Sequence, residues 1–218
     1  MNARRRWLAL AAVGLLILLV CSFVVANGTV TRPERAVFLW INRWPGWLDA
    51  PLWVFQQAGN LVIATLVTIA VGVVLRNRRL VTGALVVAGS KLVTERIVKV
   101  FVERPRPGTS IGSEAILRND VPGNGWSFVS GHSTITTAMA VLLTATLPRR
   151  WRPVPWVFVT LNALGRVHDG AHNPLDIVGG VGLGLAIGGT TVALLLVGGL
   201  ALPRNHHAAV RAQVGNNP

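Results

Sequence analysis

Three short clusters of cationic, hydroxyl and imidazole side chains stand out between residues 99 and 176 of this chain, and each falls at the expected end of an apolar segment. In chain order they are Lys99 and Arg106; Ser130, Gly131 and His132; and Arg166, His172 and Asp176. Fixed cations beside two histidines, one followed by a carboxylate, are groups suited to the transfer of a phosphoryl group. The sequence therefore points first to phosphate chemistry.

The three cations Lys99, Arg106 and Arg166 are suited to hold a phosphate. Hydrolysis of a phosphate monoester spreads negative charge over its equatorial oxygens, which preorganised cations stabilise. Arginine can bind such oxygens in bidentate fashion. We expect Ser130 and Gly131 to add exposed backbone N–H groups at a helix N-terminus, which is a common anion site. These five residues form the predicted phosphate site.

His172 is the predicted nucleophile, because a neutral imidazole can attack phosphorus and form a phosphohistidine. Asp176 lies four residues later, on a helix that Pro174 is suited to begin. We expect Asp176 to hold the ring through its other N–H group and to fix its tautomer. His132 would then protonate the leaving oxygen and later activate water. The three cations carry the counter-charge, so we predict no metal ion and no cofactor.

A metal site is the competing interpretation of the same region. His168 and Asp169, together with His172 and Asp176, offer imidazole and carboxylate ligands. Arg166 and the other cations would repel a divalent ion from them. The metal interpretation is therefore the weaker one.

Other charged residues have structural explanations. Lys91, Glu95 and Lys99 recur every four residues, so they share one helix face. We expect this face to point into the bundle, with Lys91 and Glu95 as a structural pair. Arg104 and Arg118 are expected to extend to the membrane interface.

The composition predicts a membrane protein of the all-α class. The chain has 218 residues, of which 51% are hydrophobic and only 13% are charged, whereas soluble domains carry about 25% charged residues. Long apolar runs predict an integral membrane bundle of six helices. The predicted spans are residues 7–26, 52–75, 80–102, 130–147, 154–164 and 174–202. One domain, 1–204, is expected, followed by a polar, disordered tail at 205–218.

The distribution of charge predicts the topology. The net charge is +13, and many of the basic residues gather in short clusters outside the apolar runs, as in cytoplasmic loops of membrane proteins. The clusters are Arg4 to Arg6; Arg76, Arg78 and Arg79; Arg149, Arg150 and Arg152; and Arg204 with Arg211. We therefore predict a multi-pass protein of the cytoplasmic membrane, with both termini in the cytoplasm and the site on the opposite face. Without a basic face or a stacking platform, no nucleic-acid partner is expected.

The segment between the first two runs, residues 27–50, is polar and contains Trp40, Trp44 and Trp47. Tryptophan prefers the boundary between lipid and water. We expect this segment to lie along the membrane surface.

The order and internal spacing of the three clusters resemble the motifs of the type 2 phosphatidic acid phosphatase family, whose site is related to that of the vanadium haloperoxidases. The resemblance implies that the five residues of the phosphate site bind substrate, that His132 is the general acid, and that His172 is the nucleophile with Asp176 as its partner. The chain departs from the family pattern at Val129, where proline is usual, and at Gly165, where serine is usual.

The resemblance implies metal-independent hydrolysis of a lipid phosphate or diphosphate. With no large soluble domain to grip a polar molecule, a lipid resident in the bilayer is the expected partner, either a polyprenyl (di)phosphate or a phosphatidate. A lipid phosphotransferase using the same phosphohistidine is one alternative. A non-enzymatic lipid or anion carrier is another, because intramembrane charges often line a transport path, although the sequence shows no internal repeat of the kind that carriers have.

Overall fold

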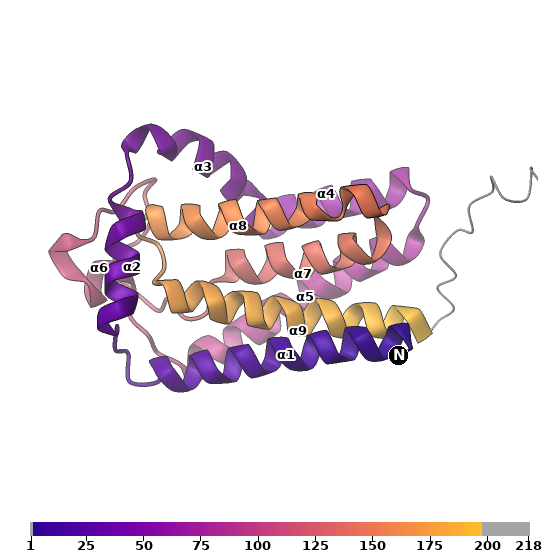
Figure 1. Cartoon of the computed structure of the whole chain (residues 1–218), viewed down its shortest axis with the longest axis horizontal. Helices are drawn as coiled ribbons and strands as arrows, with labels where there is room; N and C mark the ends of the chain where they lie inside the picture. The colour runs from indigo at the N-terminus through magenta and orange to yellow at the C-terminus, as the bar shows by residue number, and fades with distance from the viewer. Residues whose placement is uncertain (1, 198–218) are drawn as a thin grey trace, which may run out of the picture.

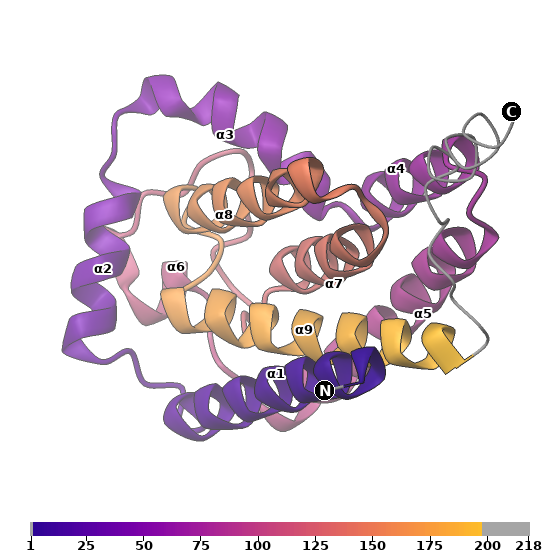
Figure 2. The ribbon, with the colours of Figure 1, turned by 45° about the vertical axis from the view of Figure 1, so that its right-hand side comes forward.

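Figure 1 shows the computed structural model of the chain, in which residues 2–197 are described. In chain order the α-helices are α1 (Ala3–Val25), α2 (Arg32–Asn42), α3 (Asp49–Gln56), α4 (Leu61–Val74), α5 (Arg78–Phe101), α6 (Pro107–Ser110), α7 (Gly131–Thr146), α8 (Pro153–His168) and α9 (Pro174–Val197). The long helices run along a common axis, and α2 lies across one end of the bundle (Figures 1 and 2). The described residues contain no β-strand, which confirms the all-α class.

Five of the six predicted apolar runs coincide with one helix each, but the second does not. Residues 52–75 were predicted as one continuous span and form α3 and α4 instead, bent by 69°. The reason is local, because Asn60 caps a new helix: its side-chain oxygen accepts hydrogen bonds from the Val62 and Ile63 N–H groups at 2.9 and 3.2 Å. The predicted tail, 205–218, and the end of the last run lie outside the described residues.

The length and apolar composition of the helices indicate a membrane protein. Within residues 2–197, Ala3–Val25 and Pro174–Leu195 are long and apolar enough to cross a bilayer, and α3 with α4 would add a third span if the bent pair counts as one. The outer face of α1 exposes Leu16, Leu19 and Phe23, the last with 85% of its surface accessible. A soluble protein rarely exposes such a continuous apolar face.

The core is built around α7. Every residue from 133 to 142 of this helix is buried, and α9 packs along it while α1 covers the far side of α9. Close approach of α1 and α9 depends on glycine: a Cβ atom on Gly14 would lie 2.5 Å from the Gly182 carbonyl oxygen. Such small-residue contacts hold helices together where lipid surrounds them. The buried position of α7 brings its first turn into the interior at the end of the bundle near α2.

A buried ion cluster ties this end together. The Arg104 side chain is fully buried and binds Glu34 of α2 with both terminal nitrogens, Nη1 to Oε1 at 3.0 Å and Nη2 to Oε2 at 2.6 Å. Nη1 also donates to Asp176 Oδ1 of α9 at 2.8 Å. Burial alone would lower the pKa of Arg104, but the hydrogen bonds and charges of Glu34 and Asp176 raise it above its usual value. Arg104 therefore stays charged and joins α2, the α5–α7 loop and α9.

The expectation that Arg104 and Arg118 extend to the interface was wrong. Arg104 points inward because two carboxylates are buried beside it. Arg118 is also mostly buried: its Nη1 donates to the His168 carbonyl oxygen at 2.6 Å, and its Nε lies 3.3 Å from Asp49 Oδ1. Both arginines hold the loop between α5 and α7 against the helix ends.

Replacing Arg104 by methionine should cost about 3–5 kcal/mol of the free energy of unfolding, because two carboxylates would remain buried without their shared cation. Denaturant titration of the detergent-solubilised protein measures the change. The matched control is Arg35→Ala, which removes a 2.8 Å pair with Glu114 whose side chains are 41% and 46% exposed. That exposed pair should contribute only about 0–1 kcal/mol. Equal, small losses in both variants would contradict the role of Arg104 as an anchor.

Candidate active site

The site lies where the first turn of α7 meets the ends of α5 and α8 and the start of α9. His172 is at its centre, in the loop between α8 and α9, with only 3% of its surface exposed. Burial lowers the pKa of His172 well below its usual value, and the positive charges of Arg166, Arg106 and Lys99 lower it further. The imidazole is therefore neutral at pH 7, as a nucleophile must be.

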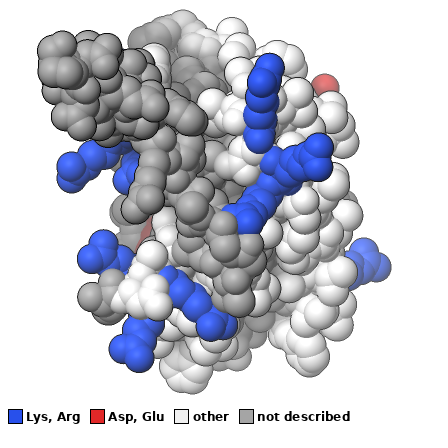
Figure 3. Space-filling view, turned by 90° about the vertical axis from the view of Figure 1, so that its right-hand side faces the viewer, with Lys and Arg blue, Asp and Glu red and all other residues white. Residues whose placement is uncertain are grey.

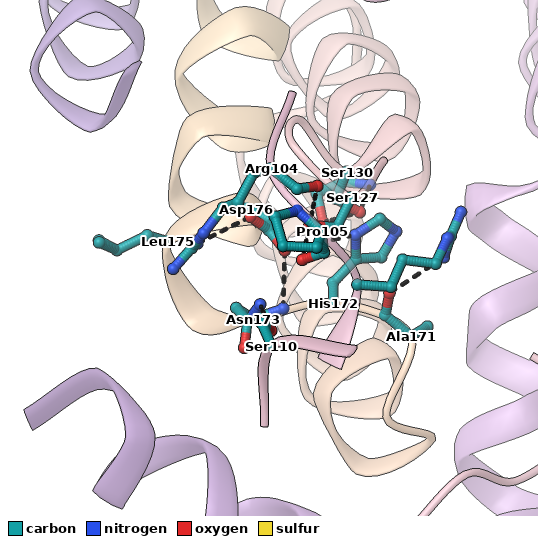
Figure 4. A network of polar contacts seen from close by, with 12 residues as sticks. Arg104, Pro105, Ser110, Ser127, Ser130, Ala171, His172, Asn173, Leu175 and Asp176 are labelled. Atoms are coloured by element: carbon teal, nitrogen blue, oxygen red, sulfur yellow. Dashed lines mark hydrogen bonds and ion pairs between the residues drawn. The ribbon is translucent and has the colours of Figure 1, made fainter. Parts of the chain in front are cut away.

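Asp176 does not hold the His172 ring as predicted. The distance from His172 Nδ1 to Asp176 Oδ2 is 3.8 Å, too long for a hydrogen bond. Figure 4 shows Asp176 engaged elsewhere: Oδ2 accepts from the Asn173 N–H group at 2.7 Å, and Oδ1 accepts from Arg104. His172 Nδ1 is buried without a hydrogen-bond partner among the described residues. Asp176 thus fixes the loop that carries the ring, and it does not hydrogen-bond to the ring itself.

The three predicted cations do come together around His172. Arg106 Nη1 donates to the Ala171 carbonyl oxygen at 3.0 Å, next to the histidine, and burial lowers the pKa of Arg106. Arg166 binds the Gln56 side-chain oxygen through Nη1 at 3.0 Å, and its Nε is buried without a partner among the described residues. The unpartnered N–H group at Arg166 Nε suits an anionic ligand.

Lys99 reaches the site already paired. Its Nζ lies 2.6 Å from Glu95 Oε1, and Lys91 Nζ lies 2.6 Å from Glu95 Oε2, so the predicted pairing is confirmed. The stripe faces inward, also as predicted. The Glu95 carboxylate lies against Gly131, because a Cβ atom on that glycine would be 2.5 Å from both carboxylate oxygens. Glu95 is thus a member of the site that the sequence interpretation had placed outside it.

The two predicted backbone donors differ in their surroundings. Ser130 is fully buried, and its N–H group donates to the Asp176 carbonyl oxygen at 3.0 Å. Its hydroxyl caps α7 by accepting from the Ser133 N–H group. The expectation of an exposed Ser130 N–H group was therefore wrong, because this amide joins α7 to α9. Gly131 follows at the first position of α7, against Glu95, where an anion would meet the helix N-terminus.

His132 lies in the first turn of α7, within electrostatic reach of Arg166 and His172. Its ring packs against Gly59 at the break between α3 and α4, where a Cβ atom would be only 2.7 Å from His132 Cδ2. The break in the second apolar run therefore makes room for His132. The sequence signal for it was available in Gly59 followed by the helix-capping Asn60.

Three of the four residues of the metal interpretation bind separate partners. His168 Nε2 pairs with Asp49 Oδ1 at 2.7 Å, Asp169 binds Gln56 and Asn119 at 2.8 and 3.1 Å, and Asp176 binds Arg104. Within residues 2–197, no three His, Cys, Asp or Glu side chains converge on a common centre that would hold a metal ion. His168 is thus a structural residue that joins α8 to the start of α3.

Known proteins share both sequence and fold with this chain. Decaprenylphosphoryl-5-phosphoribose phosphatase from two strains of Mycobacterium tuberculosis is 36% identical over 132 residues, which cover 60% of this chain and 68% of that protein. The crystal structure of Aquifex aeolicus LpxE has a TM-score of 0.65 at 20% identity, covering 72% of this chain and 93% of that one. The PAP2-type phosphatidylglycerolphosphate phosphatase from Bacillus subtilis has a TM-score of 0.66 at 19% identity, covering 89% and 98%. The two structures show a common fold.

The sequence profile described as the PAP2 superfamily matches residues 79–197, more than half of the chain. That stretch contains all three motif clusters, from Lys99 to Asp176. The family predicted from the motifs is confirmed: the chain belongs to the PAP2 superfamily.

Proposed function

We propose that this protein hydrolyses a phosphate ester of a membrane lipid through a phosphohistidine on His172. The observation that carries the proposal is the position of a buried, neutral imidazole among Lys99, Arg106 and Arg166. A phosphate dianion placed there would meet positive charge on its non-reacting oxygens, and the nucleophile would need no deprotonation. Preorganised charge of this kind is the main requirement of phosphoryl transfer.

The proposed reaction has two displacements. The His172 Nε2 lone pair attacks phosphorus while the ester P–O bond breaks, and His132 gives its proton to the leaving alkoxide. The Nδ1 side of the ring faces Asp176, whose negative charge favours the proton on Nδ1 and leaves the Nε2 lone pair free to attack. In the second step, water attacks phosphorus and passes a proton to His132 as the P–N bond breaks, which releases inorganic phosphate.

An apolar groove supports a lipid as the substrate. It has a volume of about 430 Å³ and lies between α3, α4, α7 and α8. One end is formed by Ala58 and Thr136, whose hydroxyl donates to the His132 carbonyl oxygen at 2.7 Å, and the other end reaches Trp151. We propose that this groove takes the hydrocarbon tail. The relative from M. tuberculosis favours a polyprenyl-phosphoryl sugar phosphate as the first substrate to test, before polyprenyl diphosphate and phosphatidate.

We propose that six segments cross the cytoplasmic membrane, with α3 and α4 forming one bent span, and that the site faces away from the cytoplasm. The start of α1, the turn between α4 and α5, and the turn between α7 and α8 all lie at the end of the bundle opposite α2 (Figure 1). That end carries many Lys and Arg side chains and few acidic ones (Figure 3). Basic residues favour the cytoplasmic side, so the amino terminus belongs there and the site on the outer face.

His172→Ala should abolish phosphate release, because no other group can take the place of the nucleophile. Release from each lipid phosphate by purified protein in detergent measures the effect, with elution volume as the control for folding. His132→Ala should also slow phosphate release strongly, because it removes both the acid of the first displacement and the base of the second. Substantial turnover by folded His172→Ala would overturn the nucleophile assignment.

Turnover should persist in EDTA, because side-chain cations supply the positive charge in the proposed mechanism. Initial rates on the polyprenyl-phosphoryl sugar phosphate, with and without chelator, should agree within about twofold (roughly 0.4 kcal/mol in the activation barrier). A loss that only added divalent metal restores would replace the proposed mechanism with a metal-dependent one.

The pH profile should reflect the lowered pKa of His172. An imidazole with a lowered pKa stays neutral until the pH falls below that value, so the acidic limb of kcat/KM should have its midpoint well below pH 6.5. The alkaline limb of kcat should report loss of the His132 proton in the substrate complex, and it should disappear in His132→Ala. An acidic midpoint at or above pH 6.5 would contradict the neutral, buried His172.

A further inference from the structure

Gln56, the last residue of α3, belongs to none of the sequence motifs and yet contacts the site. Only 4% of its surface is exposed. Its side-chain oxygen accepts from Arg166 Nη1 at 3.0 Å, and its side-chain nitrogen donates to Asp169 Oδ2 at 2.8 Å. Because a guanidinium only donates and a carboxylate only accepts, these two partners leave the amide one possible orientation.

The contacts of Gln56 continue outward to the loop between α5 and α7. Asp169 uses its second oxygen, Oδ1, to accept from Asn119 of that loop at 3.1 Å. The Gln56 main-chain oxygen accepts from Asn162 of α8 at 3.3 Å, which fixes the end of α3 on the helix that carries Arg166. Gln56 therefore holds the Arg166 guanidinium through one nitrogen, Nη1. The buried Nε–H group has no partner among the described residues and can still donate a hydrogen bond.

Gly165 provides the space that Gln56 occupies. A Cβ atom on Gly165 would lie 2.9 Å from Gln56 Cγ and 3.0 Å from Gln56 Nε2. This is the position where the family pattern usually has serine. Glycine at position 165 thus leaves room for an amide oxygen that binds Arg166.

We propose that Gln56 is a positioning residue that orients Arg166 toward the substrate phosphate. Gly165, which has no side chain, leaves the space that Gln56 needs for this contact. The proposal rests on the proposed function, in which Arg166 binds phosphate. Preorganised ligands bind an anion more tightly because less freedom is lost on binding. Gln56 therefore acts on phosphate affinity rather than on the chemical step alone.

Gln56→Ala should raise KM and the inhibition constant of inorganic phosphate on the order of 10-fold, the effect of losing one hydrogen bond to a charged group. Gly165→Ser should weaken phosphate binding as well, because its Cβ would push against Gln56. The matched control is Gly89→Ser in α5, where a Cβ atom would meet nothing within 4 Å; both constants should stay at the parent values.

The double variant Gln56→Ala/Gly165→Ser separates positioning from general damage. Removing the amide vacates the space that the serine needs, so the double variant should bind phosphate more tightly than the product of the two single effects predicts. Additive losses, or a phosphate inhibition constant unchanged in Gln56→Ala, would overturn the proposal. If the alanine variant melts earlier than the parent, Gln56→Met, which is closer in volume, takes its place and the same constants decide.

Arg166→Ala distinguishes this proposal from the proposed function. A weaker inhibition by inorganic phosphate in Arg166→Ala, without any change in the Gln56 variants, would overturn only the positioning role. Unchanged inhibition in Arg166→Ala would mean that Arg166 does not bind phosphate, and the proposed phosphate site would fail with it.

Discussion

The buried contact of Arg104 with Glu34 and Asp176 is the interaction on which the site depends. It is the point where α2, the α5–α7 loop and α9 meet, and a functional residue lies a few positions along the chain from the cluster in the loop and beside α9. Arg106 follows Arg104 by two residues, and His172 precedes Asp176 by four. Because buried charges are costly without partners, alternative arrangements of these segments would leave at least one charge unpaired. The ion cluster therefore selects the arrangement in which the cations surround His172.

The same balance of charge operates inside the site. Lys99, Arg106 and Arg166 repel one another, and Glu95 offsets part of that repulsion by lying between Lys91 and Lys99. Its carboxylate also lies against Gly131, at the helix terminus best suited to an anion. The Glu95 carboxylate therefore already contacts Lys99 and Gly131, two of the groups expected to bind the substrate phosphate. Glu95 lowers the electrostatic cost of burying these cations together. The substrate phosphate must therefore share Lys99 with the Glu95 carboxylate.

The motifs could be predicted from sequence because they depend on residues that are close together in the chain. The contacts that were predicted wrongly depend on residues that are far apart in the chain. Helix positions follow from apolar runs, and the inward face of Lys91, Glu95 and Lys99 follows from their four-residue period. Nothing near Arg104 indicates its partner Glu34, which is 70 residues away. The sequence already placed His172 before a helix that begins at Pro174, as the structure confirms, so the four-residue spacing rule for helices did not apply to His172 and Asp176.

The break between α3 and α4 shows why apolar content alone misjudged the second span. Residues 52–75 are apolar enough to cross a membrane as one helix, yet a polar segment from Gln56 to Asn60 interrupts them at the level of the site. Each interruption has a use: Gln56 binds Arg166, Gly59 makes room for His132, and Asn60 starts the next helix. A polar glutamine inside an apolar run is unfavourable for a simple span. In a membrane enzyme, such an interruption is itself evidence that the helix passes the active site.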